Sequence, residues 1–281
     1  MTVLVGMNFF PATGAAARRQ ARAMAALKAL GRAACVNVQW TDERFEVAGI
    51  PTIATLRRDA RTVTGRPGPR KPIVSDILDA LAPLARDRGC RYFLHTNADI
   101  EIAPAALARI EDEGRDGYAF TRTDVDPDTG ADLGAMLFGV DAFAFDVSWW
   151  ERHRSRFRAY IAGEPVWDDV YTAVLLSHSN GQFVTSEGLI RHERHETTWT
   201  AGPYAAYTAL LAALDRPYFS LWAVFHAELT ALRAAGADAA AEEALRRRVF
   251  TPGAARRGWL VQQLRAARAR ARYAMTQRRQ S

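Results

Sequence analysis

Asn97 and Asp99 are the residues whose types and spacing best suit a divalent cation. They lie two residues apart, after an aromatic and aliphatic run at residues 92–94 that predicts a short buried strand. Carboxylate and amide oxygens suit a hard cation that keeps some water and shares a phosphate-bearing ligand. Ligands of open α/β sheets bind beyond the carboxyl ends of strands, where we expect this pair. The alternative is that one of the two side chains only caps the helix predicted for residues 105–111.

Two other pairs of residues carry side chains suited to catalysis or metal binding. Asp168 and Asp169 follow Pro165 at the expected start of a helix. A carboxylate there can act as a general base, although helix starts also favour proline and acids for purely structural reasons. His192 and His195 are three residues apart and suit a metal. The alternative for these histidines is an ordinary structural role on the surface or in the core.

Two charged segments are predicted to be loops. Residues 57–71 are rich in arginine, glycine and proline. Arg66, Arg70 and Lys71 in this loop suit a phosphate group by charge and by guanidinium geometry, with a solvated turn as the alternative. Residues 122–133 carry four aspartates around a proline and a glycine, at positions that match no EF-hand pattern. We expect a solvated loop there, suited to act as a lid over bound substrate.

Strand and helix patterns alternate through the first 200 residues and predict an α/β fold. Strand, helix and strand patterns at residues 2–7, 15–30 and 34–40 favour parallel pairing with a right-handed crossover. Further strands are predicted at residues 50–56, 92–94, 118–121, 136–145 and 182–185. Further helices are predicted at residues 73–86, 105–111, 149–161 and 170–176.

From residue 204 onwards the pattern becomes helical and rich in alanine and leucine. Helices are predicted at residues 204–214, 220–234, 237–249 and 256–279, the last of them basic. We therefore expect a mostly parallel sheet flanked by helices in residues 1–200 and a helical extension in residues 201–281.

Composition and charge exclude several classes of protein. The chain has 281 residues and a net charge of +6, but residues 252–281 hold eight arginines and no acid. Because the basic character belongs to this tail, the body is not expected to bind nucleic acid. Two distant cysteines predict buried free thiols rather than a disulfide framework or a zinc site. Without a long apolar run or a signal peptide, we expect a cytoplasmic protein.

Four short motifs occur in an order that resembles bacterial glycosyltransferases of the GT-A fold, family 2-like, which use nucleotide sugars. The motifs are Asn97-x-Asp99, Gly139-x-Asp141-x-Phe143-x-Phe145, Gly163-x-x-x-Trp167-Asp168 and His192-x-x-His195-x-x-x-Trp199. The resemblance covers residues 3–199 and implies a GT-A-like, Rossmann-type catalytic domain. The chain departs from the family's Asp-x-Asp pattern because Asn97 replaces the first acid.

The resemblance implies a role for each matching residue. Asp99 with His192 or His195 would hold a divalent cation, Mn²⁺ or Mg²⁺, that contacts the sugar diphosphate. Asp168, or failing that Asp169, would be the general base if the reaction inverts configuration. The residues expected to bind the donor are Asn8, Asp42, Arg70, Lys71, Asn97, Asp99 and Asp141.

The expected activity is transfer of a sugar from a nucleotide sugar to a hydroxyl of a carbohydrate or lipid-linked acceptor. One alternative is a nucleotidyltransferase, which normally has a glycine-rich basic loop after its first strand; residues 7–14 lack it. Another is a non-catalytic module that binds nucleotide or sugar. The basic tail suits reversible docking to an anionic membrane surface, with packing on the body as the alternative.

Overall fold

The computed structural model describes residues 3–30, 35–136, 139–195 and 202–251. Its chain divides into two compact units. The first is formed by Met1–Asp59, Pro72–Ala159 and Asn180–Trp199, and the second by Ala60–Lys71, Tyr160–Ser179 and Thr200–Ser281. The second unit thus includes segments before residue 200, whereas the division predicted from sequence placed only residues 201–281 in the extension.

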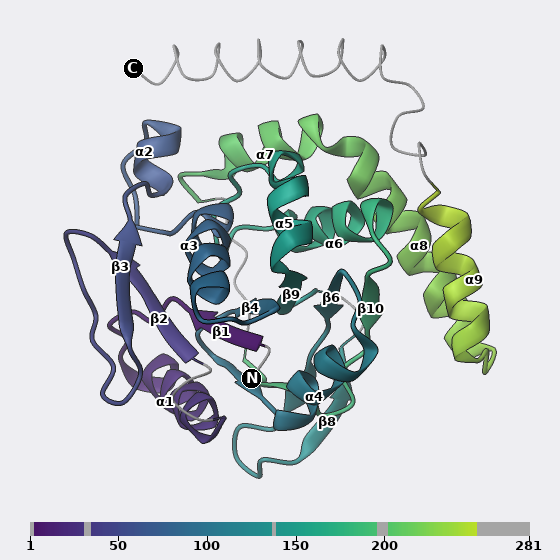
Figure 1. Cartoon of the computed structure of the whole chain (residues 1–281), viewed down its shortest axis with the longest axis horizontal. Helices are drawn as coiled ribbons and strands as arrows, with labels where there is room; N and C mark the ends of the chain where they lie inside the picture. Colours follow the sequence, from purple (N-terminus) through teal and green to yellow (C-terminus); the bar gives the residue numbers. More distant parts are fainter. Residues whose placement is uncertain (1–2, 31–34, 137–138, 196–201, 252–281) are drawn as a thin grey trace. The chain divides into compact units, whose positions relative to one another are not determined.

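A seven-stranded sheet forms the centre of the first unit (Figure 1). Its order is β10-β6-β9-β4-β1-β2-β3, and every neighbouring pair is parallel except the two that β9 makes with β4 and β6. The strands are β1 (Val3–Met7), β2 (Cys35–Trp40), β3 (Thr52–Leu56), β4 (Tyr92–Thr96), β6 (Gly117–Phe120), β9 (Ala142–Asp146) and β10 (Gln182–Val184). The predicted fold class, a mostly parallel α/β sheet flanked by helices, is confirmed.

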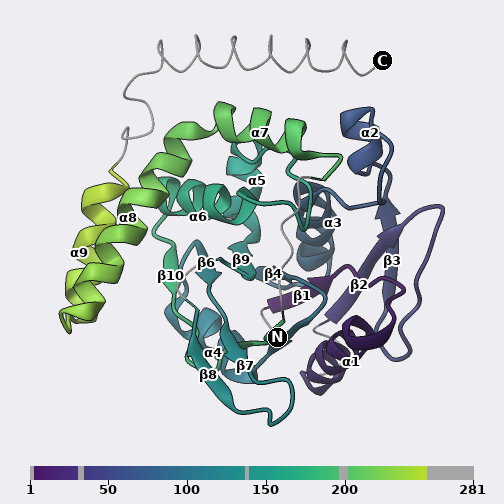
Figure 2. The same ribbon diagram turned by 180° about the vertical axis from the view of Figure 1, so that it is seen from behind.

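Helices cover both faces of this sheet, as the two opposite views show (Figures 1 and 2). On one face lie α1 (Gly14–Ala29) and α4 (Pro104–Glu113), and on the other lie α3 (Val74–Asp87) and α5 (Val147–His153), followed by a 3-10 turn at Arg154–Arg156. Because side chains alternate along a strand, both sides of the sheet bury apolar residues, for example Leu94 on one side and Phe93 on the other. Burial of these two apolar layers stabilises the unit.

A second, four-stranded sheet in the same unit has the order β5-β11-β7-β8. Its strands are β5 (Ile100–Ile102), β7 (Thr123–Val125), β8 (Asp132–Ala135) and β11 (Ile190–Glu193). β11 pairs antiparallel with β5 and parallel with β7. The turn at residues 97–99 leads from the central strand β4 of the large sheet directly into β5. The end of β4 and the small sheet are therefore joined at Asn97 and Asp99.

The small sheet corrects the prediction for residues 122–133. That segment is not a solvated loop throughout, because it contains β7 and the start of β8, and Asp124 within β7 is buried. The turn between the two strands and β8 itself are exposed to solvent, as expected, whereas β7 is buried. β11 was not predicted either. These strands have three or four residues and no apolar run, so only pairing with distant strands makes them form.

Other boundaries also differ from prediction. The expected strand at residues 136–145 begins at residue 142, and the expected helix at residues 149–161 is replaced by α5 and the 3-10 turn. The loop at residues 57–71 contains a short helix, α2 (Ala60–Thr64). Both cysteines are buried free thiols, as predicted.

The second unit is helical. Besides α2 it contains α6 (Trp167–His178), α7 (Ala205–Leu214), α8 (Arg216–Ala234) and α9 (Ala239–Val249), in which α8 packs on each of the other three. The predicted helices at residues 204–249 are confirmed. The predicted basic helix at residues 256–279 lies outside the described residues. Among the residues that are described, no helix combines the length and apolar character needed to cross a membrane.

Gly6 allows α3 to pack directly on the central strands of the sheet. A β-carbon at this position would lie 2.3 Å from Cδ2 and 2.9 Å from Cγ of Leu81 in α3, and Leu81 is fully buried. Since the branch point of the leucine is involved, rotation of its methyl groups alone cannot relieve the overlap. The missing side chain of Gly6 therefore sets how closely α3 approaches β1.

We predict that Gly6→Ala lowers the free energy of unfolding by about 1–3 kcal/mol, the usual effect of overpacking a core. Urea unfolding of the purified protein measures this change. The double variant Gly6→Ala with Leu81→Ala should lose less stability than the sum of the two single variants, because the smaller residue makes room for the new methyl group. Additive losses would contradict the proposed contact.

Candidate functional site

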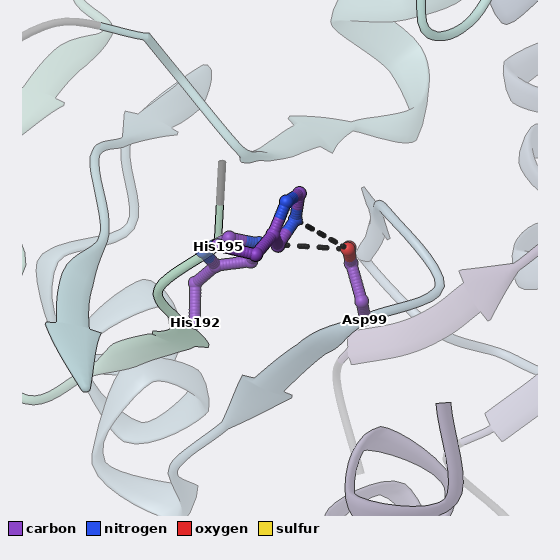
Figure 3. A group of neighbouring side chains, drawn as sticks. All are labelled: Asp99, His192 and His195. Atoms are coloured by element: carbon purple, nitrogen blue, oxygen red, sulfur yellow. Dashed lines mark ion pairs between the residues drawn. The ribbon is translucent and has the colours of Figure 1, made fainter. Parts of the chain in front are cut away.

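Asp99, His192 and His195 come together in the first unit (Figure 3). Oδ2 of Asp99 lies 3.5 Å from Nε2 of His192 and 3.8 Å from Nε2 of His195. The side chain of His192 is 7% exposed, whereas those of Asp99 and His195 are 29% and 31% exposed. One carboxylate oxygen and two imidazole nitrogens thus converge at a place that solvent can reach.

Strand pairing explains why these residues meet although they are far apart in sequence. Ile100, the first residue of β5, pairs with His192 of β11. Asp99 directly precedes Ile100, and His195 lies two residues beyond the end of β11. Because β5 and β11 run antiparallel, the beginning of one strand adjoins the end of the other. The small sheet therefore brings an acid from the end of β4 to a pair of histidines some ninety positions later.

The site favours the ionised form of Asp99. Burial opposes ionisation, but the hydrogen bond and the charge of His192, helped by His195, outweigh it, so the pKa of Asp99 is lowered. Nε of Arg19 in α1 also lies 3.9 Å from Oδ2 of Asp99. A carboxylate that stays ionised at neutral pH is ready to bind a cation.

The geometry of the three side chains fits a divalent metal ion. Their ligand atoms all lie within 4.8 Å of one another. Two ligands that are each about 2.0–2.2 Å from a first-row metal ion can be at most about 4.4 Å apart, so small side-chain movements suffice. Two imidazoles with one carboxylate suit Mn²⁺ or a later transition metal better than Mg²⁺, which prefers oxygen ligands.

A polar network around Arg122 lies next to the three candidate metal ligands. Arg122 donates through Nε to Oδ1 of Asp124 at 2.8 Å and through Nη1 to Oδ2 of Asp141 at 3.0 Å. The other oxygen of Asp141 accepts from Nδ2 of Asn97 at 3.1 Å. Burial disfavours the guanidinium, but Asp141 and Asp124 raise the pKa of Arg122. Both carboxylate oxygens of Asp141, a predicted donor contact, are therefore engaged within the protein.

Sequence reasoning missed Arg122 and Arg19 as members of this region and assigned Asp124 to a solvated loop. No sequence signal could have found them, because arginines are frequent in this chain and the strand that holds Asp124 forms only by pairing with β11 and β8. The ion pairs of Arg122 with Asp124 and Asp141 become apparent only once the strands are placed.

Asn8 and Asp42, the residues predicted to contact the nucleoside, lie beyond the ends of β1 and β2. Nδ2 of Asn8 donates to the carbonyl of Val38 at 2.6 Å, and Asp42 is exposed. The loop after β1 is held by the buried amide of Gln39, which donates to the carbonyl of Phe9 at 2.7 Å. Asn8 is thus held by hydrogen bonding, and both residues follow carboxyl ends of parallel strands, the edge where ligands of α/β proteins bind.

The predicted catalytic acids, Asp168 and Asp169, occupy the first turn of α6 in the second unit. The residue that precedes this helix, Val166, has a φ of 84° in the left-handed region. This backbone conformation is costly for a β-branched residue, by roughly 1–3 kcal/mol. Strained residues of this kind cluster at functional sites. The strain at Val166 is therefore consistent with a functional role for the two aspartates that follow it.

The carboxyl group of Asp169 has an unusually high pKa for an aspartate. Burial, and secondly the charge of Asp168, raise the pKa of Asp169 to about 7, although a hydrogen bond from the side chain of Trp222 in α8 acts in the opposite direction. A carboxyl group with this pKa can both accept and release a proton near neutral pH. Of the two acids, Asp169 therefore has the property expected of a general base.

Arg70 and Lys71 also belong to the second unit. Nζ of Lys71 donates to Oε1 of Glu164 at 2.7 Å, and this glutamate is buried. Arg70 follows Pro69, whose carbonyl accepts a hydrogen bond of 2.6 Å from the hydroxyl of Tyr204. The end of the basic loop is thus fastened within the unit, and the charge of Lys71 is balanced by Glu164.

No family model matches the sequence, and no curated protein matches it either. Among the solved structures similar to this chain are two glycosyltransferases. GalNAc-T7 with UDP, GalNAc and Mn²⁺ aligns at 11% identity and a TM-score of 0.42, over 89% of this chain and 55% of that chain. The galactosyltransferase LgtC, in complex with donor and acceptor sugar analogs, aligns at 11% identity and a TM-score of 0.33, over 73% of this chain and 91% of that chain. This chain spans about half the length of GalNAc-T7, and similarity at this level identifies no family or activity.

We predict that Asp99→Ala lowers the affinity for Mn²⁺ by at least about a hundredfold, because loss of a ligand should exceed the roughly 10- to 100-fold effect of losing an outer-shell partner. The free-Mn²⁺ signal in electron paramagnetic resonance titrations measures the affinity. Asp132→Ala is the matched control, since Asp132 lies in the same sheet but pairs with Arg191. Equal affinity of Asp99→Ala and the unaltered protein would rule out the site.

We predict that the contribution of Asp169 to stability falls as pH rises from about 4 to about 7, because its pKa is higher in the folded than in the unfolded chain. Burial lowers the pKa of His95 to about 4 and gives a contribution of opposite sign in this range, so the variant is compared with the unaltered protein at each pH. Asp169→Asn should remove this part of the slope and be more stable above pH 7, by on the order of 2–4 kcal/mol. Urea unfolding at a series of pH values measures the effect. Asp168→Asn, which removes only the neighbouring charge, should shift the slope to lower pH. An unchanged slope in Asp169→Asn would disprove the assignment.

Proposed function

We propose that this chain is a glycosyltransferase that moves a sugar from a nucleotide-sugar donor to a hydroxyl acceptor with the help of a divalent cation, Mn²⁺ rather than Mg²⁺. The observation that carries the proposal is the convergence of Asp99, His192 and His195 at the end of the central strand β4. The order of the four motifs supports it as well, because it resembles enzymes with this activity.

The chemistry explains why such a cluster would be needed. When the bond between the anomeric carbon and the phosphate oxygen breaks, the nucleoside diphosphate leaves with the electron pair and gains negative charge. A divalent cation held by Asp99 and the two histidines would stabilise that charge as it develops. The ionised state of Asp99 and the partial exposure of Asp99 and His195 support this role.

The attacking hydroxyl must lose a proton as its oxygen bonds to the anomeric carbon. We assign this proton to Asp169, with Asp168 as the second candidate, if the reaction inverts configuration. The support is the pKa of Asp169, which burial and Asp168 raise to about 7. An acid with this pKa is a stronger base than an ordinary aspartate and is still ionised in part at neutral pH.

Donor and acceptor contacts follow as parts of the same proposal. Asn8 and Asp42 at the ends of β1 and β2 would bind the nucleoside, while Arg70 and Lys71 would assist the diphosphate. Asn97 and Asp141 would act chiefly through the turn that they hold together. We further propose a hexosyl donor, a carbohydrate or lipid-linked acceptor, and a cytoplasmic location near the inner face of the membrane.

We predict that UDP-, GDP- or CMP-type nucleotides raise the melting temperature of the protein in the presence of Mn²⁺ and that the matching nucleotide sugar is turned over. Asp169→Asn should keep the nucleotide-induced shift but lose about 10²- to 10⁴-fold in turnover, because only the proton acceptor is removed. For the unaltered enzyme, kcat/KM should rise with pH up to about 7, as Asp169 becomes ionised. Calorimetry and detection of the released nucleotide measure these quantities.

The possible results separate the proposal from its alternatives. No stabilisation by any nucleotide with Mn²⁺ would reject a nucleotide-sugar enzyme. Nucleotide binding without turnover, and an Asp169→Asn variant that retains cellular function, would indicate a non-catalytic binding module. Transfer of the nucleotidyl group rather than the sugar would indicate a nucleotidyltransferase.

A further inference from the structure

His192 has two ring nitrogens in different environments. Nε2 faces Asp99, as Figure 3 shows, while Nδ1 is buried and makes no hydrogen bond within the described structure. Oδ1 of Asp124 lies 3.7 Å from this Nδ1. A neutral imidazole that binds a metal through Nε2 carries its proton on Nδ1 and needs an acceptor there. A shift of roughly 0.5–1 Å would bring Asp124 within hydrogen-bond distance.

The placement of Asp124 behind His192 follows from strand register. His192 of β11 pairs with Asp124 of β7 on one side and with Ile100 of β5 on the other. Paired residues on neighbouring strands direct their side chains to the same face of a sheet. Asp124 is buried, and its Oδ1 accepts from Arg122 and lies beside Nδ1 of His192.

Arg122 connects the support of His192 to the support of the turn that carries Asp99. Its Nε donates to the same oxygen of Asp124 that faces His192, and its Nη1 donates to Asp141. Asp141 in turn accepts from Nδ2 of Asn97, and its carbonyl accepts from Oγ1 of Thr96 at 2.6 Å. A single guanidinium, 20% exposed, therefore bridges two carboxylates that hold the two sides of the site.

We propose that Arg122 is a positioning residue for the cation: through Asp124 it holds His192 with Nε2 towards Asp99, and through Asp141 it holds the turn that ends at Asp99. This inference rests on the metal site of the proposed function. Arginine suits the task because its planar fork donates in two fixed directions, whereas lysine has one point of charge. Without Arg122, Asp124 and Asp141 would be two buried acids with no cation between them.

The test compares three variants by Mn²⁺ affinity and by the visible absorption spectrum of the Co²⁺-loaded protein, which reports the ligands and geometry of the metal. Arg122→Met should weaken Mn²⁺ binding by about 10- to 100-fold and change the Co²⁺ spectrum. Asp124→Leu removes the support of His192 but not that of the turn at Asp99, so it should weaken Mn²⁺ binding by about tenfold and also change the Co²⁺ spectrum. Arg191→Met is the control, because Arg191 precedes His192 in β11 but pairs with Asp132.

The outcomes distinguish this inference from the proposed function. If the unaltered protein binds neither Mn²⁺ nor Co²⁺, the metal site itself is wrong, and the inference falls with it. If it binds both, and Arg122→Met matches the control in affinity and spectrum, only the role of Arg122 is refuted. Melting temperatures without metal identify a variant that fails to fold. Should Arg122→Met fail in this way, Asp124→Leu decides, because unchanged affinity and spectrum would then refute the network.

Discussion

The pairing of β11 between β5 and β7 is the interaction on which the candidate metal site depends. It joins three segments from the regions of residues 100, 124 and 192 by backbone hydrogen bonds. Because those bonds fix the register, they place His192 beside Asp124 and next to the residue that follows Asp99. A slip of one residue would turn His192 to the opposite face of the sheet and remove it from the site.

Ion pairs between α1 and the small sheet reinforce this arrangement. Glu193, which follows His192 and is buried, accepts hydrogen bonds from Arg18 at 2.8 Å and Arg22 at 3.3 Å, and the bond from Arg18 lowers the pKa of Glu193. Arg22 also lies 2.8 Å from Glu101 in β5. Exposed ion pairs contribute little, but a buried carboxylate left without its arginines would be strongly destabilising. The histidine-bearing strand is thus held from one side by α1 and from the other by its neighbours in the sheet.

Two features at the start of α6 lower the stability of the protein. Val166 adopts a left-handed backbone, and Asp169 is buried beside Asp168 with its pKa raised to about 7. An asparagine in place of Asp169 would relieve the electrostatic part of the cost, so stability does not explain this residue. Features that lower stability are frequent at sites where activity depends on them. The same reasoning does not extend to Lys71, whose charge is balanced by Glu164.

The sequence alone determined the α/β class, the central strand ending at Asn97 and Asp99, and most long helices, because these depend on local periodicity and on apolar runs. It also drew attention to Asp99, His192 and His195 separately. Only the tertiary structure decided that these three side chains meet, that Asp124 is buried in a strand, and that Arg122 links Asp124 with Asp141. The strands of the small sheet have too few residues to be predicted from a local sequence pattern. Their register, which places His192 beside Asp124 and next to the residue that follows Asp99, arises from pairing between segments far apart in the chain, and no local pattern encodes it.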